Sequence, residues 1–335
     1  MDPQKEQQLI GESPSFLEVI EHVSRVASLN RPVLVIGERG TGKELIGARL
    51  HYLSGRWDGP FVKLNCAALT ESLLETELFG HEAGSFTGAT GKRLGRFELA
   101  DQGSLFLDEL SSTSNRVQEK ILRVIEYGEF NRVGGSDTVR TDVRIIGATN
   151  EDLPSLAEQG RFRADLLDRL AFDVITIPPL RVRAEDILPL AEHFAVKMTG
   201  ELGKELFEGF SEQAKELLLD YRWPGNVREL KNVVERAIYT ALGTEGPIED
   251  IVFDPFDSPW RPTSQHEDEK QESVTQAIEG PYEFKQHIQD YEIRLINEAL
   301  ETCKFNQKKT AEYLGMTYHQ LRGYLRKYEI TENED

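Results

Sequence analysis

The 335-residue sequence is poor in cysteine and has no long apolar run. Its two cysteines, Cys66 and Cys303, have no CxxC spacing, which argues against a disulfide framework or a cysteine-ligated zinc site. No apolar stretch approaches the roughly 20 residues needed to cross a bilayer. The first residues also lack the basic and apolar regions of a signal peptide. We therefore expect a cytoplasmic protein that does not insert into a membrane.

The sequence also lacks excess positive charge, with 39 Lys and Arg against 58 Asp and Glu and a formal net charge of −19. This balance excludes a chain that coats nucleic acid by bulk charge. It leaves room for a small basic module, because binding depends on the local potential.

Short apolar runs alternate with helical patterns in the first half of the chain. Near-continuous apolar strands of this kind indicate a parallel sheet covered on both faces. The pattern predicts an α/β fold with a parallel five-stranded sheet. The expected strands are 33–37, 61–66, 104–109, 143–150 and 172–177.

The composition changes three times after the last expected strand. Helical patterns follow "PPL" at 178–180, including one that Ser211 would cap, and they predict a helical lid. A polar, acidic, proline-bearing stretch then reads as a linker. The predicted domains are an α/β part at 1–177, a lid at 178–256, a flexible linker at 257–280 and a small all-α domain at 281–335.

The segment "GERGTGKE" at 37–44 directly follows the first expected strand. Glycines there let backbone N–H groups surround a triphosphate, while Lys43 reaches the β- and γ-phosphates. Glu44 stands where the general P-loop pattern has Ser or Thr, so a strand-to-helix turn without a ligand stays open as an alternative. The candidate nucleotide-binding residues are Gly37, Glu38, Arg39, Gly40, Thr41, Gly42, Lys43 and Glu44.

The strand "SLFLDE" ends in two carboxylates, Asp108 and Glu109. This is a Walker B arrangement, in which Asp108 would hold Mg²⁺ and Glu109 would polarise the attacking water. A strand that ends in an acidic turn is the alternative for this segment alone. Together with the P-loop, the pair predicts ATP hydrolysis.

Polar residues end two other strands and could reach the same edge of the sheet. Thr149 and Asn150 could sense the γ-phosphate there. Asn65 could hydrogen-bond Glu109 and hold it inactive, although a strand-terminal Asn is usually a turn residue.

Three arginines complete the candidate catalytic and nucleotide-binding set. Arg163 and Arg169, in "RFRADLLDRL", could reach a neighbouring subunit's γ-phosphate as arginine fingers, or they could be solvated residues of a helix face. Arg228, in "WPGNVREL", could contact bound nucleotide from the lid.

The C-terminal segment predicts a helix-turn-helix. Ala311 and Leu314 would face inward, Gly315 supplies the turn, and six Lys or Arg against one acid occur between Lys304 and Lys327. An amphipathic hairpin for protein pairing is the alternative. The candidate DNA-binding residues are Gln307, Lys308, Lys309, Thr317, Tyr318, His319, Gln320, Arg322, Arg326 and Lys327.

The stretch "GSFTGA" at 84–89 suits neither a helix nor a strand, because glycines flank a single aromatic residue. An exposed Phe86 is a liability unless a partner covers it.

Taken together, the segments "GERGTGKE", "ELFGHEAGSFTGA", "GSLFLDE", "FRADLLDRL" and "WPGNVRELKNVVERA" resemble the AAA+ domain of bacterial enhancer-binding proteins, which activate sigma-54 RNA polymerase. The resemblance covers residues 9–255, and the C-terminal segment is similar to the family's DNA-binding module. Glu is the family's usual residue after the P-loop lysine, so Glu44 fits this pattern.

The resemblance implies that the hexapeptide lies on a loop that touches sigma-54. The implied contact residues are Gly84, Ser85, Phe86, Thr87, Gly88 and Ala89. The chain departs from the family at Ser85, where the family has Ala, and we expect function to be retained. A second loop at 128–137 should stand beside the first.

These expectations define an ATP-hydrolysing transcription activator with ATP and Mg²⁺ as cofactors. It would bind upstream enhancer DNA, associate with the nucleoid, form a hexamer from an inactive dimer, and remodel sigma-54 RNA polymerase holoenzyme. Because the expected ATPase begins within about ten residues of Met1, we expect no sensory domain before it and regulation by a separate repressor protein. The alternatives are a sigma-54-independent regulator that uses ATP only as an oligomerisation switch and, more distantly, a helicase loader or a remodelling protease subunit.

Overall fold

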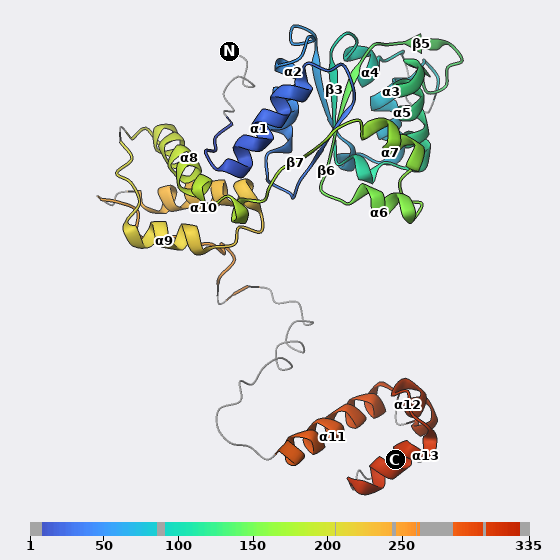
Figure 1. Ribbon diagram of the computed structural model, residues 1–335, viewed down its shortest axis with the longest axis vertical. Helices are drawn as coiled ribbons and strands as arrows, with labels where there is room; N and C mark the ends of the chain where they lie inside the picture. Colours follow the sequence, from blue (N-terminus) through green and yellow to red (C-terminus); the bar gives the residue numbers. More distant parts are fainter. Residues whose placement is uncertain are drawn as a thin grey trace. The chain divides into compact units, whose positions relative to one another are not determined.

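A computed structural model of the chain describes residues 9–85, 91–204, 206–242, 246–258, 260–261, 284–303 and 306–328. The chain divides into two compact units, Met1–Asp257 and Ser258–Asp335. Within the first unit, a sheet with helices on both faces adjoins a group of three helices (Figure 1).

The sheet has five parallel strands in the order β2-β3-β6-β1-β7. This confirms the fold expected from the apolar runs. The strands are β1 (Val33–Ile36), β2 (Phe61–Asn65), β3 (Ser104–Asp108), β6 (Arg144–Thr149) and β7 (Val174–Thr176).

Alternation of side chains along the strands divides the core between the two faces of the sheet. In β1, Val33 and Val35 pack with α1 (Pro14–Ala27) and α2 (Lys43–Tyr52), whereas Leu34 faces the opposite cluster. That opposite cluster is formed with the helices at the right of the sheet in Figure 1. They are α3 (Glu71–Phe79), α4 (Arg96–Leu99), α5 (Asn115–Tyr127), α6 (Leu153–Glu158) and α7 (Ala164–Leu170).

A second, two-stranded sheet was not expected from the sequence. The antiparallel strands β4 (Glu129–Asn131) and β5 (Thr138–Arg140) form a hairpin. β4 and the turn lie in the segment 128–137 that the sequence predicts only as a loop, and β5 directly follows it. Three-residue strands are too short to show a period-two pattern in the sequence.

The lid consists of α8 (Ile187–Glu201), α9 (Glu212–Asp220) and α10 (Asn226–Thr240), packed around Trp223, Leu230 and Val234. Ser211 caps α9 as expected, because its hydroxyl accepts a hydrogen bond from the Ala214 N–H at 3.2 Å.

The lid is joined to the first helix of the α/β part by a buried carboxylate. Asp186 accepts hydrogen bonds from the backbone N–H groups of Glu12 and Ser13 and from the Ser13 hydroxyl, at 2.6 to 2.8 Å. These contacts satisfy backbone N–H donors at the start of α1, so the orientation of α1 depends on Asp186 at the base of the lid.

The second unit contains α11 (Phe284–Thr302), α12 (Gln307–Tyr313) and α13 (Tyr318–Lys327). Ile296, Leu300, Ala311 and Leu321 form its small core, with Leu314 partly buried against them. Ala311 and Leu314 thus lie where the helix-turn-helix pattern predicts. Among the described residues, no helix is long and apolar enough to cross a membrane.

Candidate nucleotide site and interaction surfaces

The phosphate loop connects β1 to α2 at the carboxyl edge of the sheet. Gly40 and Gly42 have φ values of 79° and 98°, which favour glycine, and the Gly37 N–H donates to the Thr149 carbonyl at 3.2 Å. Helix α2 begins at Lys43, so its first N–H groups and its positive dipole end face the loop. The segment 37–44 therefore has the geometry of an anion site.

Lys43 lies folded into this loop. Its Nζ donates to the Gly37 carbonyl at 2.9 Å, and the residue is 8% exposed. Burial lowers the pKa of Lys43, while the carboxylates of Glu109 and Asp108 act in the opposite direction. The Lys43 ammonium thus lies in the field of the Walker B pair, and a phosphate would replace its carbonyl partner.

The two Walker B carboxylates have different environments. Asp108 Oδ2 accepts a hydrogen bond from Asn65 Nδ2 at 3.3 Å, and Asp108 Oδ1 is buried with no hydrogen-bond partner in the described chain. Glu109 has φ 51° and ψ 46°, a left-handed conformation that is uncommon outside glycine and clusters at active sites. That conformation turns the chain sharply at the end of β3.

Asn65 differs from its predicted role. It donates to Asp108 rather than to Glu109, and its own Oδ1 accepts from the Ala67 N–H at 2.9 Å. β2 and β3 pair in register with Asn65 opposite Asp108, which explains why the amide meets that carboxylate.

The donor set suits a magnesium ion. The orphaned Asp108 Oδ1 is an available anionic ligand, and Mg²⁺ in nucleotide sites binds one or two carboxylates together with phosphates and water. Among the described residues, no group of three or more His, Cys, Asp or Glu could hold a metal by itself. Asp108 would hold the ion, and the positive charge of the ion would offset the negative charge of the phosphates.

Of the two predicted sensor residues at the end of β6, Thr149 is buried and Asn150 is exposed. The Thr149 hydroxyl lies 3.1 Å from the Ser111 hydroxyl and accepts from the Glu151 N–H at 3.0 Å. Thr149 therefore holds the end of the strand, and Asn150 is the member of the pair that is open to a ligand.

Glu44, the last residue of the loop motif, points toward β2. Its carboxylate accepts a hydrogen bond from Lys63 Nζ at 2.6 Å, and 56% of its side chain is exposed.

The lid contacts the phosphate loop through residues that the sequence reasoning missed. Glu38 forms an ion pair with Arg181 at 2.7 Å and accepts from Asn226 Nδ2 at 3.0 Å. These hydrogen bonds, from Arg181 first and then from Asn226, lower the pKa of Glu38 to about 2. The sequence signal for Asn226 is its place in "WPGNVREL", two residues before Arg228.

Gly40 allows this contact to be close. A Cβ at Gly40 would lie 2.2 Å from the Gly225 carbonyl and 3.0 Å from Arg228 Cβ. The Arg228 N–H donates to the Gly40 carbonyl at 3.3 Å. Arg228 is thus held at the phosphate loop, where its predicted role requires it.

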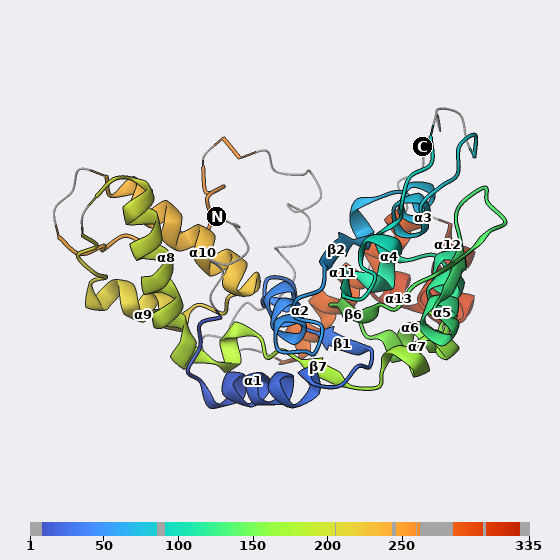
Figure 2. The ribbon, with the colours of Figure 1, turned by 90° about the horizontal axis from the view of Figure 1, so that it is seen from above.

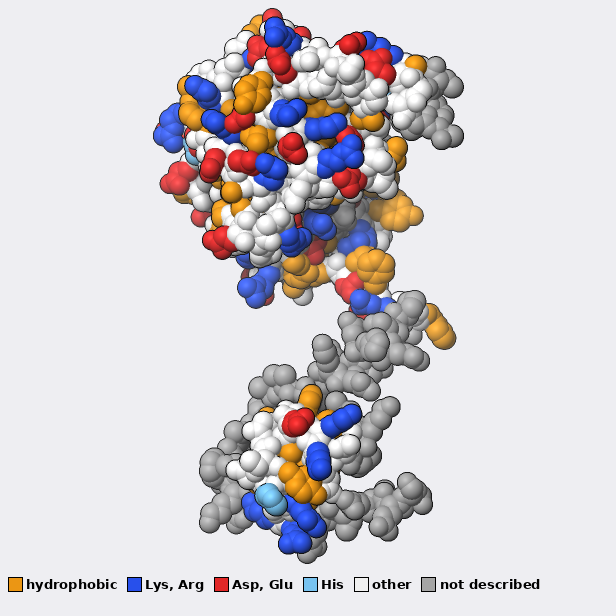
Figure 3. Space-filling model, turned by 90° about the vertical axis from the view of Figure 1, so that its right-hand side faces the viewer, with side chains coloured by type: hydrophobic (Ala, Val, Ile, Leu, Met, Phe, Trp, Pro, Cys, Tyr) orange, Lys and Arg blue, Asp and Glu red, His pale blue; other side chains and the backbone are white. Residues whose placement is uncertain are grey.

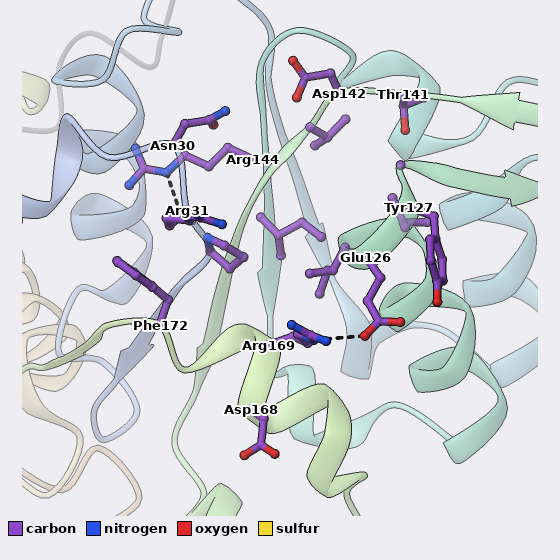
Figure 4. Close-up of a pocket in the computed structure, with 16 residues that line it drawn as sticks. Asn30, Arg31, Glu126, Tyr127, Thr141, Asp142, Arg144, Asp168, Arg169 and Phe172 are labelled. Atoms are coloured by element: carbon purple, nitrogen blue, oxygen red, sulfur yellow. Dashed lines mark hydrogen bonds and ion pairs between the residues drawn. The ribbon is translucent and has the colours of Figure 1, made fainter.

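The two candidate arginine fingers lie at opposite ends of α7, and each has an acidic partner. Arg163 binds Asp165 through Nε and Nη2, at 3.0 and 2.7 Å. Arg169 binds Glu126 through Nε at 3.0 Å. Figure 4 shows Arg169 from α7 and Glu126 from α5 pointing toward one another.

Arg169 lines a pocket of about 610 Å³ together with Pro32, Arg144 and Phe172 (Figure 4). Pro32 lies just before β1, and the phosphate loop lies just after β1. The length of β1, about 13 Å, therefore separates the pocket from the phosphate loop. Arg169 therefore lies toward the edge of the sheet opposite its own phosphate site.

Residues 86–90 lie outside the described residues, so Phe86, Thr87, Gly88 and Ala89 receive no structural account. Gly84 and Ser85 are described, and the segment that carries them projects from the end of α3 beside the β4–β5 hairpin (Figure 2). The Glu82 N–H donates to the Val133 carbonyl at 3.1 Å, and a Cβ at Gly134 would lie 2.5 Å from Ser85 Cβ. The second loop thus stands beside the first, as expected.

Lys and Arg side chains gather on the helix-turn-helix unit (Figure 3). Lys308, Lys309, His319, Arg322 and Arg326 are exposed, which suits contacts with phosphates or base edges.

Three other candidates in this unit have local roles. Thr317 and Gln320 form a capping box at the start of α13, and Lys327 lies 3.6 Å from Glu292. Gln307 and Tyr318 are partly buried.

The first unit has the features of a AAA+ ATPase: a parallel sheet in this order, a phosphate loop, a carboxylate pair and a helical lid in contact with that loop. The same chain carries a helix-turn-helix unit. Residues 9–177 match the family model of the sigma-54 interaction domain, residues 181–268 the AAA+ ATPase lid domain, and residues 288–328 the Fis family of bacterial regulatory proteins. The chain belongs to the sigma-54-dependent transcription activators: it is an ATPase that binds DNA and acts on sigma-54 RNA polymerase.

Relatives of known name support this assignment. The chain is 56% identical to the Psp operon transcriptional activator of Escherichia coli K12 over 323 residues, covering 96% of this chain and 98% of that protein. It is 45% identical to the Nif-specific regulatory protein of Azotobacter vinelandii over 94% of this chain, but it spans only 58% of that protein.

Solved structures of NtrX from Brucella abortus in complex with ATP and with ADP are also similar. They match with TM-scores of 0.68 and 0.69 at 31% identity, over 96% of this chain and 70% of theirs.

Proposed function

We propose that this chain activates transcription of a phage-shock (membrane-stress) operon by ATP-driven remodelling of the sigma-54 holoenzyme. The observation that carries the target is the 56% identity to the Psp operon activator over nearly the whole length of both chains. The Nif-specific relative is less similar and is matched over little more than half its length.

Hydrolysis divides between residues of the phosphate loop and residues at the end of β3. Lys43 and the loop N–H groups bind the phosphates, and Glu109 orients and deprotonates the attacking water. Asp108 holds the Mg²⁺ that accompanies ATP. The charges of Glu109 and Asp108 act to raise the pKa of Lys43, so the three groups lie close together, which supports this division.

The active form is a hexameric ring, and the inactive form is a dimer. The position of Arg169 supports assembly, because one chain does not bring this guanidinium to its own phosphate loop. In a ring, Arg169 of one subunit stabilises the γ-phosphate charge at its neighbour's site, with Arg163 as the second candidate. ATPase activity per subunit should therefore rise with protein concentration, and a flat profile in a monomeric protein would contradict the ring.

The hexapeptide at 84–89 carries the contact with sigma-54. Its neighbour, the β4–β5 hairpin, is hydrogen-bonded to the same loop, which supports transmission of movement to residues 86–89. Ser85 in place of the family's Ala adds only a hydroxyl group, so this contact is retained.

Regulation and targeting involve two further partners. The helix-turn-helix unit binds upstream enhancer DNA, where paired sites raise the effective concentration of subunits. A PspA-type repressor binds the ATPase domain and limits hydrolysis.

Capture of sigma-54 in gel shifts with ADP–aluminium fluoride tests the loop. Wild type should form the trapped complex, whereas Thr87→Ala should lose it while still binding ATP and DNA. The change removes one hydroxyl and one methyl group and is too small to unfold the domain. Equal capture by both proteins would refute the loop assignment.

Gel shifts with two upstream DNA fragments test the target operon. The chain should bind a psp upstream fragment more tightly than a nif upstream fragment of equal length at equal salt concentration. Equal affinity for both fragments would contradict the proposed operon while leaving the sigma-54 assignment intact.

A further inference from the structure

The two candidate fingers are held in different ways by their acidic partners. Arg163 has Nε and Nη2 on the two oxygens of Asp165, a bidentate pair that uses one whole edge of the guanidinium. Arg169 binds Glu126 through Nε alone, at 3.0 Å from Oε1. In the described part of the chain, no other hydrogen bond or ion pair of the Arg169 side chain is found, so both of its Nη groups remain available.

Guanidinium geometry makes this difference consequential. The five donors of arginine lie in one plane, so a contact at Nε fixes the direction in which the two Nη groups point. A γ-phosphate needs those two terminal groups. Arg169 can therefore bind phosphate while it keeps Glu126, whereas Arg163 must share or break its pair with Asp165.

The side chains of Glu126 and Arg169 both project from helices that are packed in the core. Helix α7 is anchored in the core by Leu166 and Leu170, and α5 by Ile121 and Leu122. Gly128, with φ 67°, ends α5 two residues after Glu126, and its N–H donates to the Val124 carbonyl at 2.9 Å. The Glu126 side chain is 24% exposed and the Arg169 side chain 61% exposed, so the acid is the more enclosed member of the pair.

We infer that Glu126 is a positioning residue for ATP hydrolysis: its carboxylate orients Arg169 by the Nε contact so that the two Nη groups face the γ-phosphate of a neighbouring subunit. This inference rests on the proposed role of Arg169 as an arginine finger. It adds that Arg169, and not Arg163, is the finger prepared before assembly. The residue acts through Arg169 and does not itself touch the nucleotide.

The inference predicts a particular kinetic signature. Loss of the Glu126 contact misorients a group that acts in the transition state, so kcat should fall while the KM for ATP stays unchanged. We expect Glu126→Ala to lower kcat about tenfold, since a finger is worth about 10³-fold or more and small misplacements cost a large part of such effects.

Two conservative variants separate positioning from charge. Glu126→Gln keeps the length and an acceptor oxygen for Nε–H, so its kcat should stay within about twofold of wild type. Glu126→Asp keeps the charge but is shorter by one methylene, so its kcat should fall nearly as far as that of Glu126→Ala. An active Glu126→Asp beside an inactive Glu126→Gln would overturn the inference. This pair also decides the question if Glu126→Ala fails to assemble.

Mixing experiments test whether the defect acts across the subunit interface. Glu126→Ala subunits keep an intact ATP site, and Lys43→Ala subunits keep an intact Glu126 and Arg169. Mixed rings should therefore hydrolyse ATP faster than the sum of the two proteins assayed separately. If the rate stays at the sum of the separate proteins although a tag on one variant co-purifies the other, the Glu126→Ala defect lies within its own subunit, and the inference fails.

Arg169→Ala separates failure of this inference from failure of the proposed finger. If Arg169→Ala hydrolyses ATP at the wild-type rate, the finger assignment itself is wrong. If Arg169→Ala is inactive and Glu126→Ala has wild-type kcat, only the positioning role is wrong. If the finger role of Arg169 and the positioning role of Glu126 are both right, the double variant Glu126→Ala/Arg169→Ala should have the same kcat as Arg169→Ala alone. Glu212→Ala, which removes an exposed acid paired with Lys215 in the lid, is the matched control and should leave kcat unchanged.

Discussion

At the scale of single residues, Lys43 and Glu109 have separate tasks at one site. Lys43→Ala should abolish ATP binding, because it removes the one buried ammonium in the phosphate loop. Glu109→Ala should keep binding and lose turnover, because it removes the group that activates water. Fluorescent-nucleotide titration and steady-state phosphate release measure the two effects. Normal turnover by Glu109→Ala would move the catalytic role to another carboxylate.

Glu38 gives a prediction for pH. Its pKa is lowered from 4.5 to about 2 by Arg181 and Asn226, so the folded state favours its charged form. The stabilisation is present above pH 4.5 and is lost as the pH falls toward 2. Glu38→Gln should therefore show a shallower fall of Tm with acidification in this window than wild type does. If calorimetry shows that Tm falls equally with pH in both proteins, the assigned contact between Glu38 and its two partners is contradicted.

At the scale of elements, Asn226 joins α10 to the phosphate loop. The side chain is buried, accepts from the Leu180 N–H at 2.8 Å, and donates to Glu38 and to the Arg39 carbonyl. Its φ of 52° adds a conformational requirement that Asn tolerates better than most residues. The start of the lid helix and the P-loop thus depend on one amide.

Asn226→Ala should lower the free energy of unfolding by about 2–3 kcal/mol, because it leaves the buried Leu180 N–H without its acceptor and strains the backbone. Asn226→Gly loses the same hydrogen bonds but suits the positive φ, so it should be about 1 kcal/mol less destabilising. Denaturant unfolding of both variants measures the difference. Equal losses would show that the backbone conformation contributes nothing.

At the scale of the whole molecule, two compact units carry separate activities. Removal of residues 281–335 should leave an ATPase with wild-type specific activity at high protein concentration, because the phosphate site, the carboxylates and the residues that match the lid model, 181–268, all lie before this boundary. Binding to upstream DNA should be lost, and activation should need more protein. Enhancer binding by the truncated chain, measured by gel shift, would refute the placement of DNA recognition in α12 and α13.

Much of this protein could be predicted from contiguous stretches of sequence. The five apolar runs became the five strands because a parallel strand buried on both faces leaves a local signature. The phosphate loop, the Asp108–Glu109 pair and the cap of α9 could be read for the same reason, since their geometry depends on neighbours along the chain.

The tertiary structure alone decided which distant side chains meet. Asn226 and Glu38 are 188 residues apart, and Asn65 proved to contact Asp108 rather than Glu109 only when the register of β2 and β3 was known. Glu126 carried no sequence signal at all, because an acid on a helix face is ordinary until packing places Arg169 against it. Periodicity and capping are local properties of the chain, whereas the partner of a charged side chain depends on how helices and strands pack, and this packing places the residues that orient catalysis.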